Sequence, residues 1–448
     1  MKLFNVKLTT LKSKLYSIVF ASFVVRVVAF FMLPNMGSTL APDEGSYAAL
    51  SLMVSENEFK LQPSYYGGLY KASRTLVLPA SLLNNFGVDP INSVRIISSV
   101  YGLLTLIILV RMLTDAMKRN PSYETYLTGK KNYVLALVLI FAFLPSHFLW
   151  STLALRESAT EFWVVCFYLI FYKVTKISKR LTLVTSTLLI LTTVMVFNSR
   201  PQVGIVLSLA IFIYFAFKLK QRITYQIIPI VLFAILFGYA STASTASTAS
   251  TTPTASTTPT APTAPTAPTA PTTETPETPE TILETILYQS ENIQKHQELN
   301  QLYAASAIKT VNCPVEGESK LAKYFCLVWR APYSTSTFLL RPFIVIDITS
   351  RLSLFGAIEN IFWLSAFLYI LVLFTRNRRL AFFGALAPSL LFFSIYSVAA
   401  GAYEGNMGTA FRHKSLILWV VLLLIASTIV ATQQRKAEQQ GISGSSQE

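Results

Sequence analysis

Two adjacent carboxylates, Asp43 and Glu44, follow the first long apolar run of this chain, within residues 41–47 (APDEGSY). A carboxylate can take a proton from a hydroxyl nucleophile, or it can help to hold a divalent cation that neutralises a diphosphate. The same pair could instead be a solvated acidic turn that caps the helix after it. The sequence therefore makes Asp43 and Glu44 candidate catalytic residues, with Asp43 as the metal ligand if a metal is used.

Other charged side chains lie near the ends of the apolar runs, mainly on the side of Asp43. A charged side chain at membrane depth costs about 2.5–3.5 kcal/mol on insertion scales, so such residues usually mark sites or pathways. The forked guanidinium of arginine suits phosphate. Together these residues predict a cavity for an anionic, hydroxyl-rich ligand. The candidate substrate-binding residues are Arg74, Arg156, Glu157, Arg200, Arg341, Glu404, Arg412 and His413.

Structural roles are the alternative for several of these residues. Arg156 and Glu157 could form an intramembrane ion pair that joins two helices. Arg412 and His413 could anchor a helix end at the lipid headgroups. His147 is more typical of a hydrogen-bonded residue at a helix end than of a catalyst.

The composition of the chain indicates a membrane protein. Of its 448 residues, 52% are hydrophobic and 13% are charged, and the mean hydropathy is +0.50. Soluble domains carry about 25% charged residues. The formal net charge of +15 is explained by Lys and Arg in cytoplasmic loops. Since the sequence has no nucleic-acid motif, nucleic acid is not an expected partner.

Ten apolar runs approach the ~20 residues that a helix needs to cross a bilayer. They predict an all-α, polytopic transmembrane bundle. The segment 75–86 is shorter and is interrupted by Asn84-Asn85, which favours an interfacial or re-entrant helix. The predicted spans are 15–34, 91–113, 132–149, 157–174, 181–198, 202–217, 223–240, 355–374, 380–400 and 414–432.

The distribution of basic residues orients this bundle. If the amino terminus is cytoplasmic, alternation of the spans puts 21 of the 37 Lys and Arg residues on the cytoplasmic side, as the positive-inside rule expects. Both termini are then cytoplasmic. The first run contains Arg26 and has no small-residue cleavage site, so it is a signal anchor. Asp43 and the candidate substrate-binding residues then face outward from a multi-pass protein of the plasma membrane.

The chain changes character after the seventh predicted span. Repeats of Ser, Thr, Ala and Pro predict a disordered linker at 241–281, and spaced apolar residues at 282–308 predict amphipathic helices. Cys313 and Cys326 lie in the same outer loop and could form a disulfide or remain free thiols. The predicted organisation is an amino-terminal bundle, the linker, an outer loop, carboxy-terminal spans and a cytoplasmic tail, at 1–240, 241–281, 282–354, 355–432 and 433–448.

A first span followed closely by an Asp-Glu pair and an aromatic residue resembles the GT-C class of polytopic glycosyltransferases, of the protein-mannosyltransferase and aminoarabinose-transferase type. Leu155-Arg156-Glu157, which opens an aromatic-rich span, extends the resemblance. The resemblance implies a sugar donor on a polyprenyl phosphate, with Asp43 as the base or metal-binding acid and Glu44 as its neighbour. The chain departs from the class in having no second acidic motif of the Asp-x-Asp sort.

Residues 340–342 and 408–413 resemble instead the bacterial polysaccharide polymerases of the O-antigen type, whose outer-loop arginines bind lipid-linked glycan. The expected function is transfer of a sugar from a polyprenyl-phosphate donor to a glycan, lipid or protein acceptor outside the membrane. The alternatives are a lipid-linked polysaccharide polymerase and a lipid or glycolipid transporter. Mg²⁺ or Mn²⁺ is the cofactor that the chemistry admits.

Overall fold

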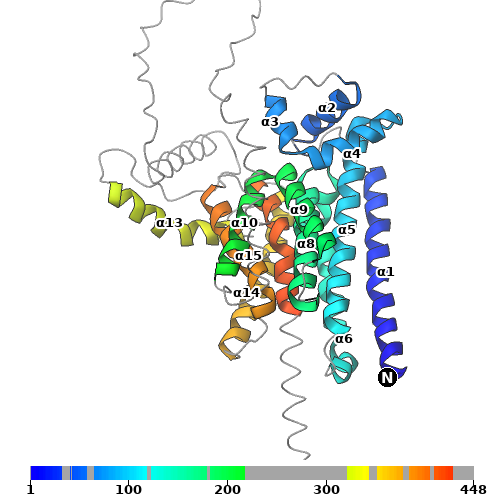
Figure 1. Cartoon of the computed structure of the whole chain (residues 1–448), viewed down its shortest axis with the longest axis vertical. Coiled ribbons are helices and arrows are strands. Elements are labelled where there is room, and N and C mark those ends of the chain that lie inside the picture. Colours follow the sequence, from blue (N-terminus) through cyan, green and yellow to red (C-terminus); the bar gives the residue numbers. More distant parts are fainter. Residues whose placement is uncertain are drawn as a thin grey trace, which may run out of the picture.

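The structure, a computed structural model, describes residues 2–32, 41, 43–57, 65–118, 123–178, 182–216, 320–342, 351–376, 383–403 and 408–426. Its regular elements are all helical (Figure 1). The helices are α1 (Lys2–Met32), α2 (Glu44–Ser55), α3 (Tyr65–Lys71), α4 (Arg74–Asn85), α5 (Pro90–Lys118), α6 (Tyr123–Phe143), α7 (Pro145–Thr152), α8 (Glu157–Tyr172) with a π-helical turn (Lys173–Ser178), α9 (Leu183–Ser199), α10 (Pro201–Ala216), α13 (Lys320–Leu340), α14 (Arg351–Arg376), α15 (Phe383–Tyr403) and a last described helix, Gly408–Ala426.

Several helices have the length and composition of membrane spans. Three pass on their own, and the pair α6 and α7 would make a fourth if the bend between them lies within one span. Four shorter apolar helices accompany them. The three are Leu11–Met32, Pro90–Asp115 and Gly408–Ala426, and the shorter ones are Leu183–Ser199, Pro201–Ala216, Leu354–Tyr369 and Ala387–Ala402. The predicted span at 223–240 and the predicted linker lie outside the described residues.

Helix α1 shows why these elements belong in lipid. Leu11, Leu15 and Val19 form a buried stripe with helical spacing, and they pack against the bundle. Phe20 and Phe31, on the rest of the helix, are exposed. Water would penalise that apolar surface, whereas a lipid bilayer accommodates it.

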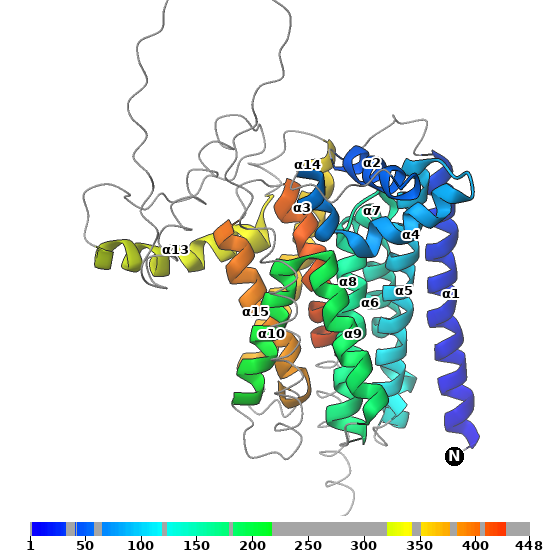
Figure 2. The ribbon, with the colours of Figure 1, turned by 45° about the horizontal axis from the view of Figure 1, so that its top comes forward.

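Helices α2, α3 and α4, which lie between the first two predicted spans in the sequence, cover one end of the bundle (Figures 1 and 2). Helix α4 lies crosswise to α5 in both views. It buries Leu76, Val77 and Ala80 and exposes Leu78 and Leu82, as an amphipathic helix at a membrane surface would. We call this end of the bundle the site end, because the candidate site lies there.

Two prolines set helix boundaries at the site end. Leu144 separates α6 from α7, Pro145 is the first residue of α7, and the two helices meet at an angle of 41°. Arg200 separates α9 from α10 in an extended conformation, with φ −163° and ψ 98°. An extended conformation is expected for a residue before a proline, here Pro201. The sharp turn places the Arg200 side chain among the helix ends.

Two apolar clusters hold the helices together. The larger cluster runs through the bundle, where Tyr168 packs on Trp419 with ring centroids 5.1 Å apart. The smaller lies under α2 and α4 at the site end and includes Tyr47 and Trp150. In it, Trp150 meets Phe411 edge to face at 5.8 Å. This contact joins α7 to the start of the last described helix and thereby fixes the position of the neighbouring Arg412.

The cysteines differ in state. Cys326, in α13, is disulfide-bonded, and Cys166 in α8 is a free thiol. Cys313, for which the sequence left open a disulfide with Cys326 or a free thiol, lies outside the described residues. The predicted amphipathic segment 282–308 lies outside them as well.

Candidate active site

Asp43 and Arg412 meet at the site end although 369 positions separate them in the chain. Asp43 precedes α2, and Arg412 lies near the start of the last described helix. The Arg412 Nη1 group donates to Asp43 Oδ2 at 2.7 Å. The Asp43 side chain is 45% exposed and that of Arg412 is 15% exposed. Asp43 is thus anchored by one oxygen and still accessible from outside the bundle.

Glu157, the first residue of α8, forms the second charged centre of the site. Its Oε1 atom lies 3.4 Å from Arg200 Nη1 and 3.8 Å from His413 Nε2. The Glu157 side chain is buried, and its Oε2 atom has no hydrogen-bond partner among the described residues. Three separate segments therefore meet at this carboxylate: the start of α8, the turn between α9 and α10, and the start of the last helix.

Tyr47 of α2 lies near both charged centres of the site, the one at Asp43 and the one at Glu157. Its electrostatic neighbours are Asp43, Arg156, Glu157 and Arg200, and burial of the phenol raises the pKa of Tyr47 to about 12. Tyr47 is consequently a neutral hydrogen-bonding group at physiological pH. The sequence analysis did not select it, although it belongs to the stretch that contains Asp43.

Arg156 does not form the ion pair with Glu157 that the sequence left open. Its Nη1 group donates to the backbone carbonyl of Ala72 at 3.2 Å, and its buried Nε group has no hydrogen-bond partner among the described residues. Arg156 still contributes to the field at Glu157 and Tyr47. A guanidinium that has no carboxylate partner in the described part of the chain, next to two charged centres, is suited to bind an anion.

The site brings several arginines to two carboxylates. Among the described residues, the guanidinium groups of Arg156, Arg200 and Arg412 lie around Asp43 and Glu157. The forked donors of arginine can hold a phosphate by several hydrogen bonds. An anionic ligand would therefore find suitable donors here.

Glu44 has a different environment from Asp43, and we assign it a structural role in place of the predicted catalytic one. Its Oε1 atom accepts from Arg95 Nε at 3.0 Å and from the Ala154 amide at 2.9 Å. Its Oε2 atom accepts from Arg95 Nη2 at 3.2 Å and from the Ala41 amide at 3.1 Å. Both oxygens are occupied and the side chain is fully buried, so no substrate can reach it. The ion pair between Glu44 and Arg95 holds α2 against α5.

Arg74, the first residue of α4, lies beside the site at the mouth of a groove. Its Nη1 group reaches Asn198 Oδ1 at 3.5 Å, and its guanidinium lies 5.4 Å from the Tyr70 ring. The groove has a volume of about 300 Å³. Arg74 and Asn198 are the polar groups of its lining at one place. The rest of the lining is mostly apolar and is formed by Thr75, Leu78, Pro79, Tyr101, Trp163 and Met195.

Two predicted site residues remain, Arg341 and Glu404. The Arg341 carbonyl accepts from Lys414 Nζ at 2.5 Å, and Lys414 also donates to Asn360 Oδ1 at 2.8 Å. Lys414 of the last helix thus links the Arg341 backbone to Asn360 of α14. Glu404 lies outside the described residues.

Positively charged or imidazole groups lie next to one oxygen of each site carboxylate. Asp43 Oδ2 accepts from Arg412, and Glu157 Oε1 lies next to Arg200 and His413. Among the described residues, no group of three or more His, Cys, Asp or Glu side chains is close enough to hold a metal ion. The Mg²⁺ or Mn²⁺ that the sequence admits stays a prediction, and we derive no step through a metal.

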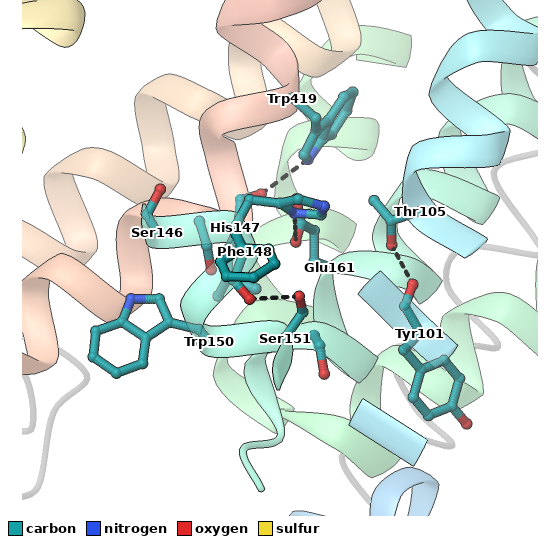
Figure 3. A network of polar contacts seen from close by, with 12 residues as sticks. Tyr101, Thr105, Ser146, His147, Phe148, Trp150, Ser151, Glu161 and Trp419 are labelled. Carbon is teal, nitrogen blue, oxygen red and sulfur yellow. Dashed lines mark hydrogen bonds and ion pairs between the residues drawn. The ribbon is translucent and has the colours of Figure 1, made fainter. Parts of the chain in front are cut away.

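A further polar network lies one helical turn deeper along α8. His147 Nδ1 lies 3.1 Å from Glu161 Oε2, and the two side chains point toward each other, with Trp419 nearby (Figure 3). Arg26 of α1 donates through Nη2 to Ser151 Oγ at 3.1 Å. All of these groups are buried. They join α1, α7 and α8, as expected of His147 and Arg26 in structural roles.

Arg95 is the main structural residue that the sequence analysis missed. The predicted span 91–113 contains two charged residues, Arg95 and Arg111, and Arg95 is the buried one. The cost of a charge at that depth was the signal that could have identified it.

Comparisons of the chain with protein-family models, with curated proteins and with solved structures found no match.

Proposed function

We propose that this chain is a membrane glycosyltransferase that moves a sugar from a polyprenyl-phosphate donor to an acceptor hydroxyl at the site end of the bundle. The observation that carries the proposal is the accessible carboxylate of Asp43, held by Arg412, near Arg156, a guanidinium with no carboxylate partner among the described residues. A phosphate would be a suitable partner for that guanidinium. In the cell, the site end would be the outer face of the plasma membrane.

The groove beside Arg74 supports a lipid-linked donor over a soluble one. Its volume of about 300 Å³ lies at the lower end of the range for ligand pockets, and its lining is mostly apolar. Leu78, in that lining, is exposed on α4, so the groove reaches the apolar surface of the protein. The first isoprene units would lie in the groove, with the phosphate near Arg74 and Arg156.

In the proposed reaction, Asp43 accepts the proton of the acceptor hydroxyl while the oxygen of that hydroxyl forms a bond to the anomeric carbon. The bond between that carbon and the phosphate oxygen breaks, and the electron pair leaves with polyprenyl phosphate. The arginines stabilise the charge that develops on the leaving phosphate. Attack from the face opposite the phosphate inverts the anomeric configuration.

Release of polyprenyl phosphate tests this proposal. The protein in lipid vesicles would be given a panel of polyprenyl-phosphate sugars and an envelope extract as the source of acceptor. We expect at least one donor to be consumed, with a matching amount of polyprenyl phosphate formed. Arg156→Gln should lower kcat/KM by about 10- to 100-fold, because one charge-assisted hydrogen bond is worth about 1.5–3 kcal/mol.

Arg111→Gln is the matched control for this experiment. Arg111 is an exposed arginine of α5, at the helix end opposite the site, and its substitution should leave kcat/KM unchanged. Equal losses in the two variants, or no turnover of any donor by the unaltered protein, would contradict the proposed function.

A further inference from the structure

Helix α13 has an apolar face that no described element covers. Phe325, Val328, Trp329 and Tyr333 recur at helical spacing on that face and are exposed, Trp329 by 85%. The opposite face, which includes Ser334 and Phe338, is buried. Four large apolar or aromatic side chains on one exposed face are unusual for a surface in water.

The buried face fixes α13 to the site end of the bundle. A Cβ atom on Gly401 of α15 would lie 2.8 Å from the Ser334 carbonyl carbon, so the two backbones are in close contact. Phe338 packs against Tyr396 of α15 with ring centroids 6.4 Å apart. Gly401 lies in the last turn of α15, shortly before the helix that carries Arg412. The docked half of α13 therefore lies at the level of the site.

A second contact sets the same level. Pro342, directly after α13, lies next to Gly356 in the second turn of α14, where a Cβ atom would be 3.1 Å from Pro342 Cγ. Further along α14, Ile358, Ile361 and Leu364 are exposed, as expected of a helix surrounded by acyl chains. The end of α13 thus meets α14 where the lipid-facing surface of that helix begins.

From these contacts α13 leaves the bundle sideways. It runs crosswise to the long helices in both views, and its first half extends beyond α15 (Figures 1 and 2). A helix in this orientation, at the end of the spans, is parallel to the membrane surface. Trp and Tyr are enriched at membrane interfaces, because their rings combine an apolar body with a polar group.

We propose that α13 is an in-plane membrane helix whose Phe325, Val328, Trp329 and Tyr333 side chains lie at the boundary between headgroups and acyl chains of the leaflet at the site end. We infer that lipid covers this face, because α13 lies at the end of the spans and the exposed apolar surface of α14 continues into it. The inference does not depend on the proposed glycosyl transfer.

Fluorescence quenching of Trp329 tests the inference on the full chain in phospholipid vesicles. The difference between the unaltered protein and Trp329→Phe isolates the signal of Trp329, because the variant keeps the other four tryptophans. Three of these, Trp150, Trp363 and Trp419, are buried, and Trp163 is partly buried. Lipids brominated near the headgroup end of their acyl chains should remove most of that difference signal. Aqueous iodide should remove little of it.

Trp363→Phe is the matched control, because this fully buried side chain should contribute little to either kind of quenching. Strong iodide quenching of the Trp329 signal with no effect of brominated lipid would place the face in water. Protection from both quenchers would show that protein covers it. Either of these results would overturn the inference.

Discussion

Asp43→Asn is expected to abolish sugar transfer while leaving the fold intact. The substitution removes a carboxylate that is nearly half exposed and that has one partner, Arg412, so little packing is lost. A general base contributes about 10²–10⁴-fold to rate, and the asparagine amide cannot accept the proton. Turnover of a polyprenyl-phosphate sugar in vesicles measures the loss, and the thermal unfolding midpoint in detergent measures the fold.

Two outcomes of this experiment would count against catalysis by Asp43. If Asp43→Asn retained full activity, the role of Asp43 as base would be wrong, however well the arginines bind phosphate. If it lost activity together with its cooperative unfolding transition, the ion pair with Arg412 would be structural and the loss would say nothing in favour of catalysis by Asp43.

Glu44→Gln is expected to destabilise the protein strongly. The substitution leaves the buried guanidinium of Arg95 without a compensating charge, and breaking a buried ion pair on one side costs about 3–5 kcal/mol. Since α2 is fastened to α5 by this pair, the segment that carries Asp43 should loosen as well. The midpoint of thermal or detergent-induced unfolding should fall, and transfer should weaken as a consequence.

Two further variants make the result specific. Glu56→Gln changes an exposed carboxylate just after α2 and should leave the midpoint unchanged. Glu44→Gln combined with Arg95→Met removes both charges and should recover part of the stability, because a buried pair can be replaced by apolar groups at little cost. No recovery in the double variant, or normal stability of Glu44→Gln, would contradict the assigned role.

The sequence predicted the helical class and the grouping of charges better than the separate roles of Asp43 and Glu44. Asp43, Glu157 and Arg412 could be grouped because a charge at a helix end in a membrane protein needs a reason, and alternation of spans put these ends on one side. That Glu44 is structural depends on Arg95, 51 positions away, and on the Ala154 amide. Such tertiary contacts leave no mark in the local pattern around Asp43.

The region between the first two predicted spans shows the same limit for the fold. The segment 75–86 was predicted to be an interfacial or re-entrant helix, and α4 (Arg74–Asn85) occupies it. A helix after the acidic pair was one of two alternatives, and α2 occupies that place. The helix α3 was not predicted, because a short segment carries too few periods of apolar residues to be identified. The turn at Arg200 was predictable in its position, since Pro201 ends the preceding helix, but its approach to Glu157 required the packing of α8 against α9.

Equilibrium binding of polyprenyl phosphate, without turnover, tests most directly the claim that the arginines at the site end form an anion site beside Asp43. The account predicts that the unaltered protein binds this lipid, that Arg156→Gln weakens its Kd by about tenfold or more, and that Asp43→Asn binds at least as tightly because Arg412 is then free to join the phosphate. Arg111→Gln should match the unaltered protein. Failure of the unaltered protein to bind the lipid, or an Arg156→Gln variant that binds it unchanged, would contradict the account.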